Sequence, residues 1–164
     1  MHITRKLCLV PIFVALMSCG GADLPQTQVM IASDGYAIHG FDAVGYFTEG
    51  VALKGSEEFS AEWNGANWLF HSAENRDLFQ ANPERYAPQY GGWCAYGVAE
   101  GYAAETDPEN AWAIHNDKLY LNWDEEVASE WEANKGALLQ SSENKWPGVR
   151  QQLGANDATV YWHD

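Results

Sequence analysis

The sequence predicts an α+β domain, in which a small antiparallel sheet built from two hairpins is combined with several short helices. In two segments, 58–71 and 111–123, apolar and polar residues alternate on either side of a two-residue turn. Helical patterns lie between and after these segments, and no connection has the usual length of a parallel crossover. The chain of 164 residues is long enough for one such domain with a hydrophobic core.

The first hairpin is expected to turn at Asn64-Gly65, a pair that favours a tight turn. The register then places its apolar pairs on one face: Trp63 with Ala66, Ala61 with Trp68, and Phe59 with Phe70. One further step in that register places His71 opposite Glu58.

The segments beside this hairpin are a weak strand and two short helices. Residues 36–39 alternate weakly, as a strand does. Ser72 is a suitable N-cap for a helix over 73–81, and the following Pro83 begins a single helical turn over 83–86.

The second hairpin is expected to turn at Asn116-Asp117. Its pairs would be Ile114 with Leu119, Trp112 with Leu121, and His115 with Lys118. Asp124 then caps a helix for which Gly136 is the stop signal, and a further helix over 137–146 would end at Pro147.

The N-terminus has the pattern of a targeting segment. Arg5 and Lys6 precede an apolar run over 7–17 that is too short to span a bilayer. The ending Leu16-Met17-Ser18-Cys19 resembles the cleavage box of bacterial lipoproteins, which implies that Cys19 carries lipid. Because Gly20 follows instead of an aspartate, the pattern resembles outer-membrane sorting on the periplasmic side of the cell envelope. The alternative is an ordinary secretory signal that is cut nearby.

The expected organisation therefore has four parts. They are a lipoprotein signal peptide over 1–18, a tether over 19–34, the folded domain with its extension over 35–147, and a tail over 148–164. Within the tail, residues 159–162 could add a strand.

Processing would isolate one thiol. Cys8 leaves with the signal and Cys19 is acylated, so Cys94 has no intramolecular disulfide partner. Glycines at 91, 92 and 97 suggest an unusual backbone path, or a close approach by another group. Cys94 is either a reactive or metal-binding thiol or a small buried residue in an aromatic core.

The chain is strongly acidic, with a formal net charge of −14. This charge argues against nucleic acid as a partner and against electrostatic binding to anionic lipid. It favours either a solvated surface or one that attracts cations.

Residues 42–86 resemble the YHS domain, a small metal-associated module related to the treble-clef-like TRASH domains. The resemblance is carried by four elements: Asp42-Ala43-Val44, Trp63-Asn64-Gly65, Phe70 to Asn75, and Phe79 to Pro83 with Tyr86. Continued through 90–101 and the second hairpin, the chain looks like the extended, secreted form of that family. The resemblance implies a treble-clef-like or TRASH-like core.

The family's metal-binding members place cysteines at positions that correspond here to Gly45, His71 and Asn75. Because these residues supply no thiolate, the usual cysteine-rich zinc or copper site cannot be built from them. The first hypothesis is therefore a reorganised site for copper or zinc. Cys94 would supply a thiolate and His71 an imidazole, with His39 as the next ligand and Asp42 as a weaker oxygen ligand or an orienting partner. The implied role is to bind or handle a metal ion in the cell envelope, without catalysis.

Two other hypotheses remain open. The first is a structural or interaction module that has lost its metal and keeps its fold through an aromatic core. The second is a thiol-based redox protein that uses Cys94, against which stands the absence of a Cys-x-x-Cys motif from the sequence. The sequence points to no particular protein partner.

Overall fold

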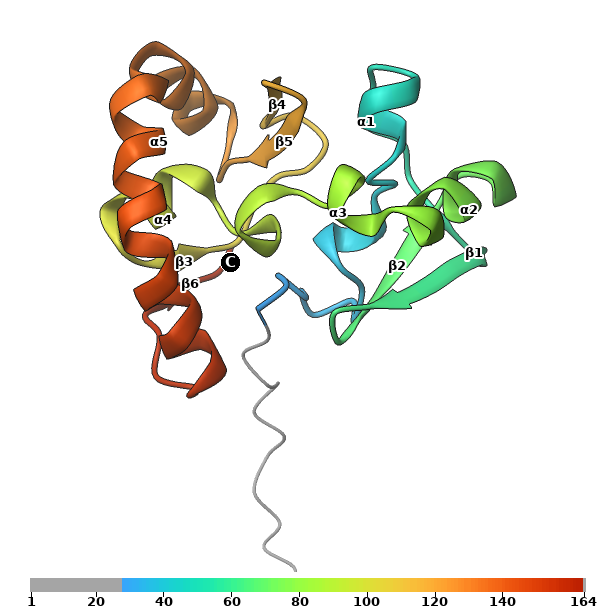
Figure 1. Cartoon of the computed structure of the whole chain (residues 1–164), viewed down its shortest axis with the longest axis horizontal. Coiled ribbons are helices and arrows are strands. Elements are labelled where there is room, and N and C mark those ends of the chain that lie inside the picture. The colour runs from blue at the N-terminus through green and yellow to red at the C-terminus, as the bar shows by residue number, and fades with distance from the viewer. Residues whose placement is uncertain (1–27, 164) are drawn as a thin grey trace, which may run out of the picture.

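The computed structural model describes residues 28–163 and confirms the α+β class (Figure 1). In chain order the elements are η1 (Ile38–Gly40), α1 (Gly45–Thr48), β1 (Ser56–Trp63), β2 (Ala66–Phe70), α2 (Ala73–Ala81), α3 (Pro83–Tyr86), η2 (Gln89–Gly92), α4 (Ala95–Glu100), β3 (Ala103–Ala104), β4 (Trp112–His115), β5 (Lys118–Leu121), α5 (Glu125–Gly154) and β6 (Val160–Tyr161). Both predicted hairpins are present. They do not join into one sheet, because β1-β2, β4-β5 and the parallel pair β3-β6 each form a separate two-stranded sheet. The treble-clef likeness stays a prediction.

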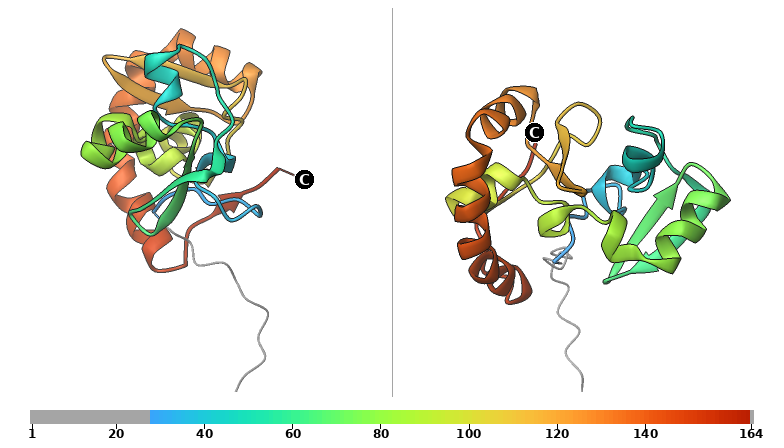
Figure 2. Two further views of the ribbon diagram at one scale, coloured as in Figure 1. Left: turned by 90° about the vertical axis from the view of Figure 1, so that its right-hand side faces the viewer. Right: turned by 45° about the horizontal axis from the view of Figure 1, so that its top comes forward.

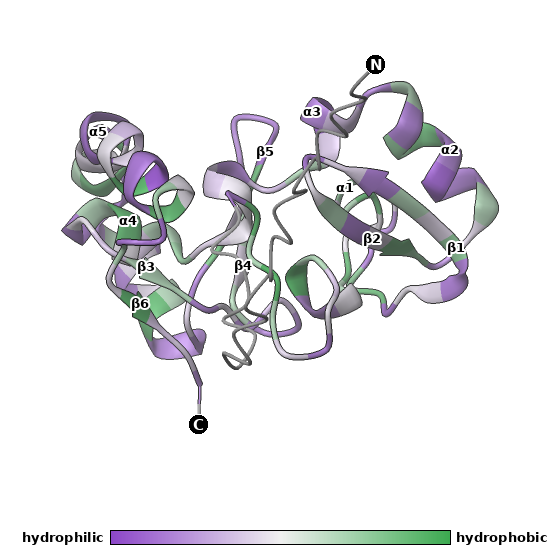
Figure 3. Ribbon diagram, turned by 90° about the horizontal axis from the view of Figure 1, so that it is seen from below, coloured by the Kyte–Doolittle hydropathy of each residue, from purple (hydrophilic) through white to green (hydrophobic). Residues whose placement is uncertain are grey.

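The elements are arranged in two groups around the second hairpin. β1, β2, α1 and α2 lie on one side, α4 and α5 lie on the other, and β4-β5 lies between them (Figures 1 and 2). One hydrophobic cluster joins the groups, because it contains both Phe79 of α2 and Leu153 of α5. Hydrophilic and hydrophobic residues alternate along α2 and α5 (Figure 3), as expected for helices with one face on a core.

The first hairpin has the predicted turn but not the whole predicted register. Its pairs are Trp63 with Ala66, Ala61 with Trp68, Glu62 with Asn67, Ser60 with Leu69, and Ser56 with Phe70. The pairing shifts between Ser56 and Ser60, so the predicted contacts of Phe59 with Phe70 and of Glu58 with His71 are wrong. Just before this irregular stretch, Gly55 passes so close to β2 that a Cβ atom there would lie 2.5 Å from the carbonyl carbon of Leu69.

Local capping works as predicted after each hairpin. The Ser72 hydroxyl accepts a hydrogen bond from the Asn75 N–H at 3.1 Å, and α2 and α3 have the predicted bounds. The Asp124 carboxylate accepts from the Val127 N–H at 2.8 Å at the start of α5. The three predicted pairs of the second hairpin are also confirmed.

Helix α5 continues through both predicted stop signals, Gly136 and Pro147. Contacts with α4 explain why the helix persists. The Ser141 hydroxyl donates to the Ala99 carbonyl at 2.7 Å, and Lys145 Nζ donates to the same carbonyl at 2.6 Å. A glycine costs a helix only about 1 kcal/mol, so tertiary packing can outweigh it.

Buried residues lie on both sides of the range 35–147, whose ends stay a prediction. Val29 and Met30 are fully buried, and the Met30 N–H donates to the Gly91 carbonyl at 2.9 Å. At the other end Leu153 is fully buried, and β6 supplies the strand expected in the tail. The predicted strand over 36–39 is instead a bridge from Ile31 to Ala37 that leads into η1.

The predicted signal peptide, the start of the tether and Cys19 lie outside the described residues. Between residues 28 and 163, the structure contains no helix long and apolar enough to cross a membrane.

Candidate functional site

Asp42 is fully buried, and its carboxylate accepts four hydrogen bonds. Oδ1 accepts from the backbone N–H groups of Val44 at 2.8 Å and Gly45 at 3.2 Å. Oδ2 accepts from the backbone N–H of His71 at 2.9 Å and from the side-chain amide of Asn75 at 2.7 Å. These bonds join the start of α1, the end of β2 and the first turn of α2.

Three of the donors to Asp42 have a further property in common. Gly45, His71 and Asn75 are the positions where the family resemblance places metal-ligating cysteines. The carboxylate therefore connects the same three segments that a thiolate-bound metal would connect. Because both of its oxygens already accept two hydrogen bonds, Asp42 has no free lone pair to offer as a metal ligand.

Cys94 is 2% exposed and forms the N-cap of α4. Its sulfur accepts a hydrogen bond from the Gly97 N–H at 3.4 Å, and its thiol donates to Asn122 Oδ1 at 3.9 Å. Burial raises the pKa of the Cys94 thiol, although nearby backbone N–H groups oppose that shift. The side chain is therefore a neutral capping group at neutral pH, not an activated thiolate.

The glycines around Cys94 confirm the predicted close approach by other groups. Gly91 has a φ of +66°, and a Cβ atom there would lie 1.9 Å from the Gln28 carbonyl oxygen. A Cβ atom on Gly97 would lie 2.8 Å from the Tyr102 ring. Both approaching groups belong to this chain, so these glycines are required by packing.

The structure does not bring Cys94, His71, His39 and Asp42 into one site. Across residues 28–163, no three His, Cys, Asp or Glu side chains form a group that could hold a metal ion. The reason lies in their positions. Asp42 contacts the backbone N–H of His71 and not its imidazole, which belongs to an exposed residue. Cys94 caps α4, which lies on the other side of the molecule.

His39 instead belongs to a cluster around Glu105, which is 6% exposed. His39 Nε2 lies 3.0 Å from Glu105 Oε1, and its Nδ1 lies 3.6 Å from Asp34 Oδ2. The other oxygen, Glu105 Oε2, accepts the backbone N–H of His163 at 2.6 Å and lies 3.5 Å from Nδ1 of that imidazole. A buried carboxylate thus contacts histidines from two distant parts of the chain.

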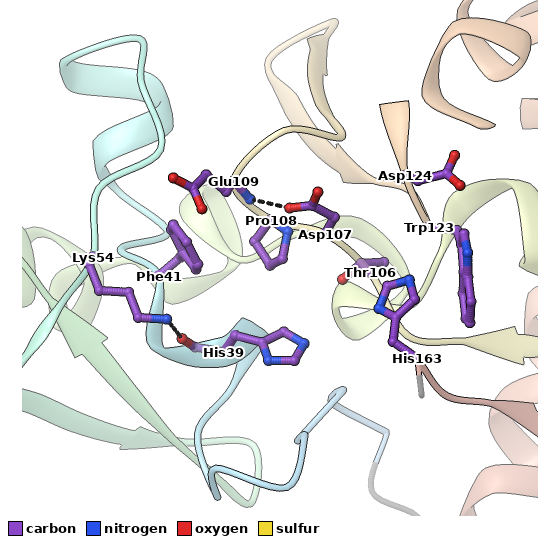
Figure 4. A pocket seen from close by; sticks show the side chains of 10 residues that line it. All are labelled: His39, Phe41, Lys54, Thr106, Asp107, Pro108, Glu109, Trp123, Asp124 and His163. Atoms are coloured by element: carbon purple, nitrogen blue, oxygen red, sulfur yellow. Dashed lines mark hydrogen bonds between the residues drawn. The ribbon is translucent and has the colours of Figure 1, made fainter. Parts of the chain in front are cut away.

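The two histidines line a cleft of about 590 Å³. Figure 4 shows how the side chains around it lie: His39, Phe41, Lys54, Thr106, Asp107, Pro108, Glu109, Trp123, Asp124 and His163. The Trp123 and His163 rings are 3.8 Å apart between centroids, and Lys54 Nζ lies 4.3 Å above the Phe41 ring. Charged groups of both signs therefore surround a space large enough for a small ligand.

The sequence did not indicate the members of this cluster other than His39. Glu105 stands in no recognisable motif, and His163 lies in a tail whose structure the sequence left open. The parallel pairing of β3 with β6 brings the two together. No local sequence pattern predicts this long-range contact, so the cluster is visible only in the folded structure.

Comparison with known families gives a match that begins two residues after Asp42. Residues 44–90 match the family model of the YHS domain. This chain contains a YHS domain. The matched residues run from the start of α1 into η2 and include all three positions where cysteines would be expected. Cys94, Glu105 and α5 lie beyond the match. No curated protein and no solved structure gives a significant match to the chain.

Proposed function

We propose that this protein is a YHS module of the cell envelope that does not need a metal ion to hold its fold. Its role is to interact with a ligand or a protein partner. In this proposal the Asp42 carboxylate holds together the segments that a metal holds in metal-binding members of the family. The observation that carries it is that Gly45, His71 and Asn75 each donate a hydrogen bond to Asp42.

The chemistry of this region opposes a cation there. A soft metal ion needs thiolate or imidazole ligands, whereas Asp42 is surrounded by N–H groups that point their positive ends inward. Those donors satisfy a buried negative charge, and a cation would have to displace them.

Metal analysis of the purified mature protein tests this proposal. We expect substoichiometric copper and zinc, and a melting temperature that does not change when EDTA is added. The control is Cys94→Ala, which should have the same metal content as the wild type. Stoichiometric metal that is lost in Cys94→Ala would overturn the proposal and restore the thiolate site.

A second candidate function is the binding of copper or zinc at the cluster of His39, Glu105 and His163. Two imidazoles that contact one buried carboxylate favour it, because this donor set suits both ions. As they stand, these three side chains do not form a group that could hold a metal ion, so binding would require both imidazole rings to turn towards a shared ion. The metal-associated character of the YHS family supports this candidate.

Calorimetric titration with Cu²⁺ and Zn²⁺ distinguishes this second candidate from the metal-independent module. Binding that disappears in Glu105→Gln and in His163→Ala, and persists in Cys94→Ala, would support it. Binding that all three variants retain would place the metal elsewhere.

The thiol-based redox hypothesis is less well supported. Cys94 is buried, its pKa is raised by burial, and its nearest polar partners are an amide and a backbone N–H. Slow alkylation of the native protein would agree with this assignment, whereas rapid alkylation at neutral pH would contradict it.

Location in the envelope rests on the N-terminal pattern. We propose that the mature chain begins at a lipidated Cys19 and is anchored in the outer membrane, facing the periplasm. The basic pair, the apolar run and the Leu-Met-Ser-Cys ending support this location. Acyl-chain labelling should disappear in Cys19→Ser, and labelling that persists would contradict the lipid anchor.

A further inference from the structure

A second cavity, of about 340 Å³, lies beside Cys94 and is walled largely by aromatic rings. Four of its seven lining residues are aromatic, namely Tyr96, Tyr102, Trp123 and Tyr161, and none of the seven is basic. The volume lies in the range of roughly 300–1,000 Å³ that is typical of ligand pockets. We call this cavity the aromatic pocket.

The walls of the aromatic pocket come from four separate segments. Tyr96 lies in α4, Tyr102 just after it, Trp123 just before α5, and Tyr161 in β6. The Tyr102 and Tyr161 rings are 5.0 Å apart between centroids and inclined by 72°, so they form two adjoining walls.

Packing fixes two of these rings in place. Tyr102 lies directly against Gly97, where a Cβ atom would come within 2.8 Å of the ring. Trp123 is in contact with the His163 ring. His163 itself is engaged with Glu105, so the nearest imidazole is already beside a carboxylate.

The electrostatic surroundings of the pocket are neutral at the walls and negative at the rim. The Tyr96 hydroxyl donates to Glu130 Oε1 at 3.3 Å, and that carboxylate raises the pKa of Tyr96. Burial is the main cause that raises the pKa of Tyr102 and of Cys94, and Glu100 adds to the shift of Tyr102 as Asp124 adds to that of Cys94. The walls of the pocket therefore hold no basic side chain, and the Glu130 carboxylate contacts Tyr96 at the rim.

We propose that the aromatic pocket binds an organic ammonium cation, with its methylated head group held between the rings. Aromatic faces carry negative electrostatic potential and attract cations, most strongly those that are weakly hydrated. The carboxylates at the rim add attraction over a longer range. A neutral apolar ligand would gain from neither effect, and an anion would be repelled.

This inference rests on the binding role proposed above and names the class of ligand. It does not depend on how the YHS core is held together. Choline binding and metal content can be measured on the same preparation, so each proposal can fail independently. Metal-free protein that does not bind choline overturns only the ammonium site. Protein that binds choline but also contains stoichiometric metal at a Cys94-dependent site overturns only the metal-independent core.

The test is calorimetric titration of the mature protein with choline and with its neutral isostere 3,3-dimethyl-1-butanol. We expect saturable choline binding and about tenfold weaker binding of the neutral isostere, as the size of a cation–π interaction implies. No choline binding, or equal binding of the two compounds, would overturn the proposal.

Two variants of the pocket and one matched control locate the site. Tyr161 is 52% exposed, so Tyr161→Leu should fold, and it should weaken choline binding about tenfold. Glu130→Gln removes the rim carboxylate that Tyr96 contacts, and it should weaken choline binding by a smaller factor.

The control is Glu57→Gln. Glu57 accepts a hydrogen bond from the Tyr36 hydroxyl at 2.6 Å in an equivalent exposed tyrosine–glutamate pair away from the pocket. Its removal should leave choline affinity unchanged. An equal loss in Glu57→Gln and Glu130→Gln would show that choline responds only to the overall charge, which would overturn the proposed site.

Discussion

Two buried carboxylates in this protein have opposite surroundings. Asp42 is fully buried and is surrounded by neutral N–H donors that satisfy both of its oxygens. Glu105 is almost as buried, yet it contacts two ionisable imidazoles at the edge of a cleft. Burial alone therefore does not distinguish a structural carboxylate from one placed for binding.

The partners of each group explain the difference. Three backbone N–H groups and the Asn75 amide donate to Asp42, so this carboxylate holds separate segments of the chain together. The imidazole rings of His39 and His163 are side chains that can rotate towards a ligand, so the surroundings of Glu105 can respond. The following variants test this distinction, beginning with the largest expected effect.

Asp42→Ala should lower the free energy of unfolding by about 3–5 kcal/mol, because four donors lose a buried charged partner. Urea denaturation measures this loss. Asp107→Ala is the matched control, since Asp107 accepts three hydrogen bonds from nearby groups but is only half-buried. Its replacement should cost no more than about 1 kcal/mol. Equal losses in the two variants would show that Asp42 is no more than a local turn residue.

Asn75→Ala removes one of the donors to Asp42 and should cost about 1–2 kcal/mol. The comparison variant is Asn134→Ala, whose side chain donates to the Glu130 carbonyl on the exposed surface of α5. That change should alter stability by no more than about 0.5 kcal/mol. A double-mutant cycle of Asp42→Ala and Asn75→Ala should show clear coupling, and purely additive losses would count against a shared network.

Glu105→Gln should cost about 1 kcal/mol, clearly less than Asp42→Ala, because the amide retains the shape and one acceptor. Its main effect should be local, with changed NMR signals for the His39 and His163 rings. A loss of stability as large as that of Asp42→Ala, with unchanged ring signals, would remove the distinction between the two carboxylates.

Cys94→Ser should have the smallest effect and should depend on pH. Because burial raises the folded-state pKa of Cys94, the folded protein keeps this proton more tightly than the unfolded chain does. Its contribution is fully present below the ordinary pKa of 9.0 and is lost as the pH rises above it. Serine can replace the cap without titrating, so the stability advantage of the wild type should shrink above about pH 9. Urea denaturation across that range measures it, and parallel curves would contradict a buried neutral thiol.

Features decided within a few residues could be predicted from the sequence. The Asn64-Gly65 and Asn116-Asp117 turns, the Ser72 and Asp124 caps and the pairs of the second hairpin all follow local rules. The YHS resemblance also identified the positions that lack cysteine. Those positions are Gly45, His71 and Asn75, and in the structure each donates a hydrogen bond to Asp42.

Features that depend on contacts distant in sequence could not be predicted. Helix α5 continues past Gly136 and Pro147, and between them Ser141 and Lys145 bond to the Ala99 carbonyl of α4. The register of β1 is irregular between Ser56 and Ser60, next to the point where Gly55 passes close to Leu69 of β2. Neither effect has a signature in the residues concerned.

The sequence by itself determined the class of the fold and the YHS match of residues 44–90, and the resemblance implied that the usual cysteine ligands are missing. The tertiary structure decided that Asp42 accepts four hydrogen bonds, since its donors converge only when the chain is folded. It also decided that Cys94 caps a helix beside an aromatic pocket and that Glu105 meets two histidines. Burial and distance between remote residues set the chemistry of these groups, and both arise only when the chain is folded.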